Sequence, residues 1–159
     1  MTLLIDLKIM EETYNYSEAE LKQLGDAIVW TALLAAIHVD GVINPEEKAE
    51  AISVAHIRSF STADYIKPFY KHLDSHFERD FDAYSAMIPD GTQDEKESFI
   101  QEKITEALAI MPEIGPLFTK YFSDDLKSFY NKVFHADSNV FQIFFMPVLT
   151  SHLNKFGLK

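Results

Sequence analysis

Hydrophobic residues recur along this chain with helical spacing. From residue 17 onward, apolar side chains return every three or four positions, which gathers them on one face of an α-helix. No stretch alternates between apolar and polar residues as a half-buried β-strand does. The pattern therefore predicts an all-α protein, folded as a single-domain bundle of six to seven helices.

The first predicted helix is the central one. It begins at the capping box Ser17-Glu18-Ala19-Glu20, in which the Ser and Glu side chains each bond a free backbone N–H. One apolar face carries Leu21, Leu24, Ile28, Thr31 and Ala35, and a second carries Ala27, Trp30, Leu34 and Ile37. A helix that is apolar on two faces belongs in the middle of a bundle. Its predicted end is near Asp40-Gly41, where Gly supplies a left-handed residue.

Caps, breaks and apolar stripes predict the remaining helices. Their expected ranges are 45–60, 61–88, 92–111, 117–134 and 140–156. Pro68, near the start of the second range, allows either a kink or a late start, and Pro147 is expected to bend the last helix. We expect one domain over residues 1–159, with core helices at about 17–111 and aromatic-rich helices at about 116–157, because no flexible polar linker is present.

Charge narrows the possible partners. The 159 residues carry a net charge of −11, and only Arg58 and Arg79 are arginines. Since phosphate recognition depends on clustered Lys and Arg, a nucleic acid is not an expected partner. An acidic surface suits cations or basic proteins, or serves solubility alone.

The sequence lacks cysteine, and it shows neither a signal peptide nor a membrane-spanning segment. The chain has no cysteine, which excludes disulfides, thiolate nucleophiles and cysteine-bound zinc. The first residues include Asp6 where a signal peptide carries bases, and the longest uncharged stretch, Ser138 to Asn154, is too short and too polar to span a bilayer. We expect a cytoplasmic protein without membrane insertion.

The turn after the central helix carries a family resemblance. Residues 35–47 read AAIHVDGVINPEE: small helical residues, Asp-Gly, an aliphatic residue two positions later, and Glu in the next first turn. This segment resembles the signature of the TerB-like (tellurite resistance) family. The resemblance implies an all-helical bundle of comparable length, a role as an accessory domain in stress-response or membrane-associated systems, and a divalent metal bound through Asp40, Glu46 and Glu47.

The same residues also have a structural interpretation, and the sequence favours it. Gly41 can end one helix, Asn44 can cap the next in a capping box with Glu47, and Glu46 suits the positive end of the helix dipole. A standard EF-hand is excluded, because placing Gly41 at its sixth position puts Ala36 and His38 where acidic ligands belong.

A second acidic motif has two candidates. Asp90-Gly91 with Glu97 repeats the spacing of the first motif, although its helix cap lies closer to the Gly. His135-Ala136-Asp137 repeats its His-x-Asp, without the Gly and without a following Glu. Neither is a clean copy.

Histidines offer one further candidate for metal. His72 and His76 have the i, i+4 spacing of zinc ligands, and Asp80 follows one turn later. The Glu of a metalloprotease HExxH motif is missing, and charged neighbours surround the pair, so a solvated helix face is the favoured interpretation. We find no phosphate-binding loop, nucleophile elbow or other catalytic motif, and do not expect an enzyme.

The predicted last helix is apolar nearly all round. Burial is the favoured explanation for its phenylalanines, and the alternative is a surface for a partner protein or a second copy, formed by Phe141, Phe144 and Phe145. The sequence thus predicts a non-enzymatic helical accessory or adaptor domain with a possible divalent-cation site. The alternative is a pure interaction or dimerisation domain that binds no ligand.

Overall fold

The protein is described by a computed structural model, which covers residues 15–38 and 41–134. In these residues seven helices follow one another and no strand occurs, so the all-α bundle is confirmed. They are α2 (Glu18–Ile37), α3 (Pro45–Ser61), α4 (Lys67–Asp74), α5 (Phe77–Ser85), α6 (Gln93–Leu108), α7 (Met111–Ile114) and α8 (Pro116–Phe134).

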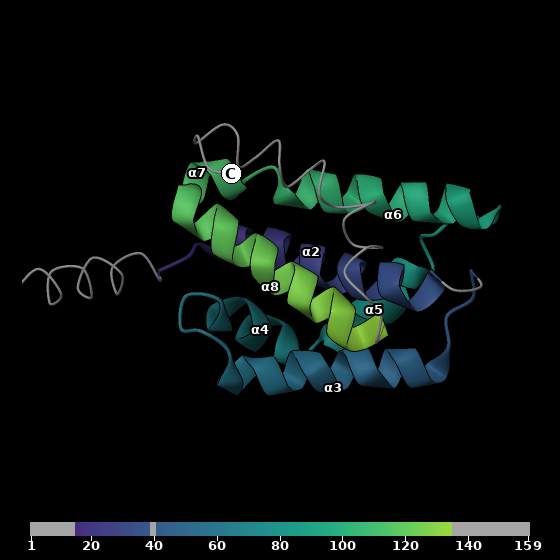
Figure 1. Cartoon of the computed structure of the whole chain (residues 1–159), viewed down its shortest axis with the longest axis horizontal. Coiled ribbons are helices and arrows are strands. Elements are labelled where there is room, and N and C mark those ends of the chain that lie inside the picture. Colours follow the sequence, from purple (N-terminus) through teal and green to yellow (C-terminus); the bar gives the residue numbers. More distant parts are fainter. Residues whose placement is uncertain (1–14, 39–40, 135–159) are drawn as a thin grey trace, which may run out of the picture.

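Helix α2 is the axis of the bundle. Figure 1 shows it in the middle, with α6 on one side and α3 with α4 on the other. It packs against α3, α4, α5, α6 and α8, and every residue from 27 to 37 is buried. The two apolar faces predicted a central helix, and this prediction is confirmed. The one polar residue in that stretch, Thr31, donates a 2.7 Å hydrogen bond to the Ala27 carbonyl and so leaves no unpaired hydroxyl in the core.

The first predicted cap is confirmed in full. The N–H of Glu20 donates to Ser17 Oγ at 3.1 Å, and the N–H of Ser17 donates to Glu20 Oε1 at 2.9 Å. At α6, the cap bond from Glu95 N–H to Thr92 Oγ1 is present at 3.2 Å, without a reciprocal bond from the Glu95 side chain among the described contacts. At α3, Asn44 accepts from the N–H of Glu46 at 2.8 Å rather than from that of Glu47.

The predicted helix over 61–88 is two helices in the structure. Helix α4 starts late, at Lys67, as Pro68 allowed, and ends at Asp74. His76 then adopts φ −138° and ψ 13°, outside the helical region, and α5 begins at Phe77. The buried stripe runs through the break, with Leu73 before it and Phe77 after it. Because both pieces bury the same face, hydrophobic spacing alone could not reveal the interruption.

A charged network joins α3, α4 and α8. The Arg58 guanidinium donates to Asp125 Oδ1 at 2.6 Å and to Ser128 Oγ at 2.9 Å, and it lies 5.8 Å from the ring centre of Tyr70. The Tyr70 hydroxyl donates to the other oxygen of Asp125 at 2.5 Å. Burial, followed by the charge of Asp125, raises the pKa of Tyr70 well above its ordinary value. Burial also raises the pKa of Asp125, although Arg58 acts against that shift.

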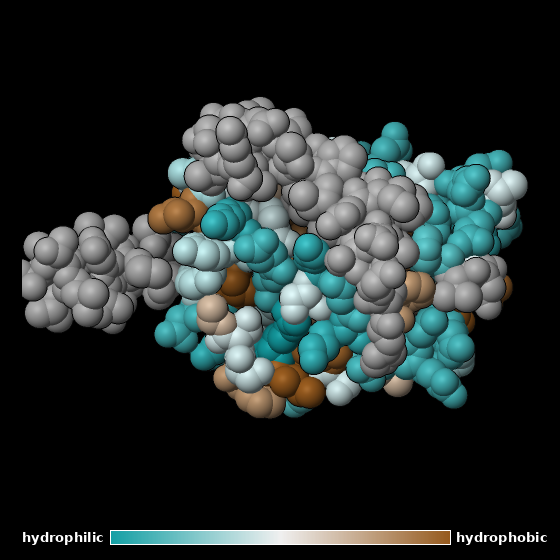
Figure 2. All heavy atoms as spheres, in the orientation of Figure 1, coloured by the Kyte–Doolittle hydropathy of each residue, from teal (hydrophilic) through white to brown (hydrophobic). Residues whose placement is uncertain are grey.

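One face of the molecule is mainly polar. Figure 2 shows a largely hydrophilic face, on which hydrophobic side chains form small separate areas. The large hydrophobic side chains that are exposed among the described residues are Val42, Ile57, Phe60, Met87, Leu117 and Tyr121. Within residues 15–38 and 41–134, no helix combines the length and the apolar character needed to cross a membrane.

Candidate functional site

Gly41, in the turn between α2 and α3, has the left-handed backbone that the sequence predicted. Helix α2 ends at Ile37 with His38 as its C-cap, and Gly41 takes the left-handed φ of 74°. The N–H of Gly41 donates to the Ile37 carbonyl at 2.8 Å, which closes the helix end. Asp40, the first predicted metal ligand, lies outside the described residues.

The other two predicted ligands lie in the first turn of α3. Glu46 is exposed, whereas Glu47 is half-buried and its Oε2 atom is shielded from solvent. In the described part of the chain, no group of three or more His, Asp or Glu side chains is arranged to hold a metal ion. Any site at this turn would therefore need Asp40 in addition to its described neighbours.

Helix α6 packs its first two turns against the same turn. Oε1 of Glu97 lies 2.9 Å from Nδ1 of His38, and the Glu97 residue is only 4% exposed. The Gln93 amide donates to the His38 carbonyl and, at 3.3 Å, to Glu97. Lys96 extends to the turn itself, where its Nζ donates to the Gly41 carbonyl at 3.1 Å. A buried carboxylate and an ammonium group thus both contact the residues that flank this turn.

The Asp90-Gly91 segment also meets this turn. A hollow of about 380 Å³ is lined by Ile37, Gly41, Val42, Ile43, Ser85, Ile88, Asp90 and Lys96. Asp90 and Gly41 therefore face one space, although they are 49 positions apart in the sequence. Of the two candidate second motifs, Asp90 with Glu97 is adjacent to the first in space, and Asp137 lies outside the described residues.

The buried carboxylate of Glu97 affects the pKa of Tyr130 in α8. The Tyr130 side chain is fully buried, and burial followed by the negative charge of Glu97 raises the pKa of its hydroxyl. The neighbouring Phe134 presents its ring to His38 edge-on, with 5.3 Å between the ring centres. The carboxylate of Glu97 is therefore enclosed by the ends of α2, α6 and α8, where its field is weakly screened.

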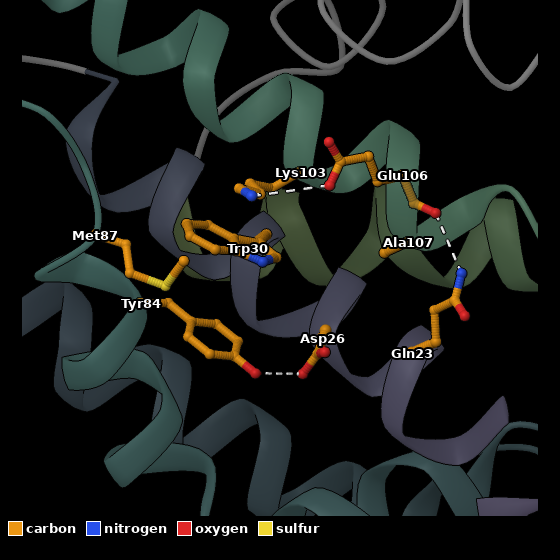
Figure 3. A pocket seen from close by; sticks show the side chains of 8 residues that line it. All are labelled: Gln23, Asp26, Trp30, Tyr84, Met87, Lys103, Glu106 and Ala107. Atoms are coloured by element: carbon orange, nitrogen blue, oxygen red, sulfur yellow. Dashed lines mark hydrogen bonds and ion pairs between the residues drawn. The ribbon is translucent and has the colours of Figure 1, made fainter. Parts of the chain in front are cut away.

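A second hollow lies nearer the start of α2 and is drawn in Figure 3. Its volume is about 370 Å³, and it is lined by Gln23, Asp26, Trp30, Tyr84, Met87, Lys103, Glu106 and Ala107. The rings of Trp30 and Tyr84 stack at 4.9 Å, and the Tyr84 hydroxyl donates to Asp26 at 2.6 Å. Its charged groups are already paired, Asp26 with Lys22 and Lys103 with Glu106.

Sequence reasoning missed several residues that the fold brings to the turn. Gln93 and Lys96 read as ordinary polar positions at the start of a helix, and His38 was noted for excluding an EF-hand and for its His-x-Asp pattern. The one available signal was Glu97, which was singled out for its spacing from Asp90. The interaction residues Phe141, Phe144 and Phe145 lie outside the described residues and remain a prediction.

Comparison with known proteins adds no further assignment. No protein-family model matches the sequence, and no curated protein or solved structure shows significant similarity to it.

Proposed function

We propose that this chain is a non-enzymatic helical accessory domain of the TerB-like kind, which binds a divalent cation at the turn between α2 and α3. The observation that carries the proposal is that Gly41, which follows Asp40 in the sequence, and Asp90, which precedes Gly91, line one hollow. Sequence spacing pairs each of these segments with an acid seven positions on, Glu47 and Glu97.

The chemistry around the turn favours a hard cation. Ca²⁺, Mg²⁺ and Mn²⁺ take oxygen ligands from carboxylates and backbone carbonyls. The Gly41 carbonyl already accepts a bond from a cationic group, Lys96, and Asp90 lines the same hollow. Asp40 precedes Gly41 directly in the sequence, and Glu46 and Glu47 open the next helix. The sequence therefore supplies oxygen donors on both sides of Gly41.

An adaptor role is consistent with the rest of the molecule. Cation binding at the end of a central helix would stabilise the junction of α2, α3 and α6, and so the surface that these helices present to a partner. The net charge of −11 also favours cations over anions as partners. In this proposal the domain works by binding, in a stress-response setting, and catalyses no reaction.

Calorimetric titration and thermal unfolding with Ca²⁺, Mg²⁺ or Mn²⁺ test the cation site. We expect one ion per chain, and a saturating ion at a hundredfold over its Kd adds about 2.7 kcal/mol, which corresponds to roughly 5–10 °C in melting temperature. Asp40→Asn should remove the binding and leave the helical circular dichroism unchanged. Asp94→Asn, an acid in the first turn of α6, is the matched control and should bind as the unmodified chain does.

Two results would overturn the proposal. One is the absence of both heat and thermal shift at millimolar concentrations of all three ions. The other is global unfolding of Asp40→Asn without metal, which would assign the turn a purely structural role.

A further inference from the structure

His72 and His76 contact each other across the break between α4 and α5. His72 lies in the last turn of α4, and His76 is the residue before α5. Their ring centres are 5.2 Å apart and the ring planes are inclined by 85°. The two imidazoles therefore lie close together with nearly perpendicular planes. They flank the short turn between α4 and α5 rather than one continuous helix.

This separation suits a shared metal ion. Zn²⁺ binds imidazole nitrogen at about 2.0 Å, so two rings that share a tetrahedral ion have their centres about 5 Å apart. The observed 5.2 Å between the ring centres agrees with that spacing. Both side chains are half-buried, which leaves the pair open to an ion from solvent.

A carboxylate holds one ring of the pair in place. Nδ1 of His76 lies 2.6 Å from Oδ2 of Asp80, whose side chain is 14% exposed. An ionised carboxylate can only accept, so Nδ1 donates its proton and the remaining nitrogen, Nε2, is the free donor for a metal. Arg79 donates to the other Asp80 oxygen at 3.3 Å. This carboxylate–histidine arrangement is the usual outer support of a zinc ligand.

His56 provides the comparison within the same chain. Its Nδ1 also meets a carboxylate, Asp74 Oδ1, at 2.7 Å, so its ring is supported in the same way. Its ring neighbour, however, is Phe60, with 5.6 Å between the centres. One supported imidazole without a second donor makes a poor metal site.

We propose that His72 and His76 form a two-histidine Zn²⁺ site, with Asp80 as the residue that positions His76. Since no third side chain among the described residues joins the pair, water or a small ligand completes the four-coordinate shell. The site is independent of the cation site at the Asp40-Gly41 turn, because imidazole suits Zn²⁺ whereas carboxylate and carbonyl oxygens suit Ca²⁺, Mg²⁺ and Mn²⁺.

Calorimetric titration of the full chain with Zn²⁺ alone tests this site. We expect one ion per chain, at least tenfold weaker binding in His72→Asn, and about 10- to 100-fold weaker binding in Asp80→Asn. His56→Asn is the matched control, and Asp40→Asn separates the two proposed sites. Both should bind this Zn²⁺ as the unmodified chain does.

Paramagnetic Co²⁺ supplies a readout that needs no variant. It should broaden the imidazole resonances of His72 and His76 first, and those of His56 only at higher concentration. Three results would overturn the proposal: no Zn²⁺ binding, equal weakening by His72→Asn and His56→Asn, or broadening that begins at a different histidine. Loss of Zn²⁺ binding with Ca²⁺ or Mn²⁺ binding intact would remove this site alone and leave the proposed function standing.

Discussion

Nδ1 of His38 lies 2.9 Å from Oε1 of Glu97, and this contact ties the C-cap of the central helix to α6. The Glu97 side chain is 5% exposed and that of His38 is 24% exposed. A carboxylate so far from water is stable only with a close partner, because its desolvation is otherwise uncompensated. The contact therefore holds the turn and the start of α6 together.

Removing the Glu97 carboxylate should destabilise the fold. We expect Glu97→Ala to lower the free energy of unfolding by about 3 kcal/mol, since it removes the carboxylate that contacts His38 and leaves a cavity among the ends of three helices. Urea unfolding followed by circular dichroism measures the change. Glu102→Ala, an exposed position of the same helix, should stay within about 0.5 kcal/mol. Equal effects of the two variants would contradict a stabilising role for the pair.

The left-handed backbone of Gly41 should make this position sensitive to substitution. Gly41→Ala should cost about 1–2 kcal/mol of unfolding free energy, because a Cβ strains a residue with φ of 74°. Gly41→Asn should cost less, since Asn tolerates this region. Gly91→Ala is the control: its Cβ would come closest to the flexible carboxylate end of Glu95, which can move aside. A larger loss in Gly91→Ala than in Gly41→Ala would show that backbone strain is not the controlling factor.

The chain has two arginines, and only one is enclosed. Arg58→Lys should lower the unfolding free energy by about 2 kcal/mol, because Lys cannot bond Asp125 and Ser128 together while lying over the Tyr70 ring. The side chain of Arg79 is 75% exposed, so Arg79→Lys should change stability by less than about 0.5 kcal/mol. Thermal unfolding of the two variants measures both stability losses. Equal losses in the two variants would contradict a stabilising role for the Arg58 contacts.

Alkaline pH should weaken the fold through Tyr70. Burial raises the pKa of this phenol in the folded chain, so the unfolded chain loses its proton first, near the ordinary pKa of about 10. Stability from this group is therefore complete below pH 10 and falls as the pH rises above it. Tyr70→Phe should be less stable at neutral pH, because it loses the bond to Asp125, and its stability should fall less steeply above pH 10.

The control for that experiment is Tyr121→Phe, a change at a tyrosine that is 40% exposed. Its unfolding free energy should follow the unmodified chain at every pH. If Tyr70→Phe and the unmodified chain show the same slope above pH 10, Tyr70 does not cause the alkaline loss.

Local rules predicted much of the fold. Ser17 with Glu20 and Asn44 with Pro45 marked helix starts that the structure confirms, because a cap depends on residues within a few positions of one another. The interruption at His76 was missed, since the apolar stripe continues unchanged on both sides of it. Hydrophobic spacing reports which face is buried and carries little information about where a helix ends.

The surroundings of the turn were much harder to predict. His38 and Glu97 are 59 positions apart, and the sequence relates Glu97 to Asp90 without relating it to His38. Lys96 reaches Gly41 across 55 positions, for which no local pattern exists. Such contacts follow from how α6 packs on α2, and a single sequence contains no rule that states this packing. The sequence showed the i, i+4 spacing of His72 and His76. The arrangement of their rings could not be predicted, because it depends on the interruption between α4 and α5.

The enclosure of α2 by five other helices has a consequence for how the molecule opens. Any neighbour that detaches uncovers part of a helix whose residues 27–37 are all buried. The backbone amides of this stretch should therefore exchange with solvent deuterium only when the whole molecule unfolds, and proteases should find no cleavage site there in the native state. A ligand that stabilises such a domain should therefore change how often the whole bundle unfolds, because no smaller part of it can open independently.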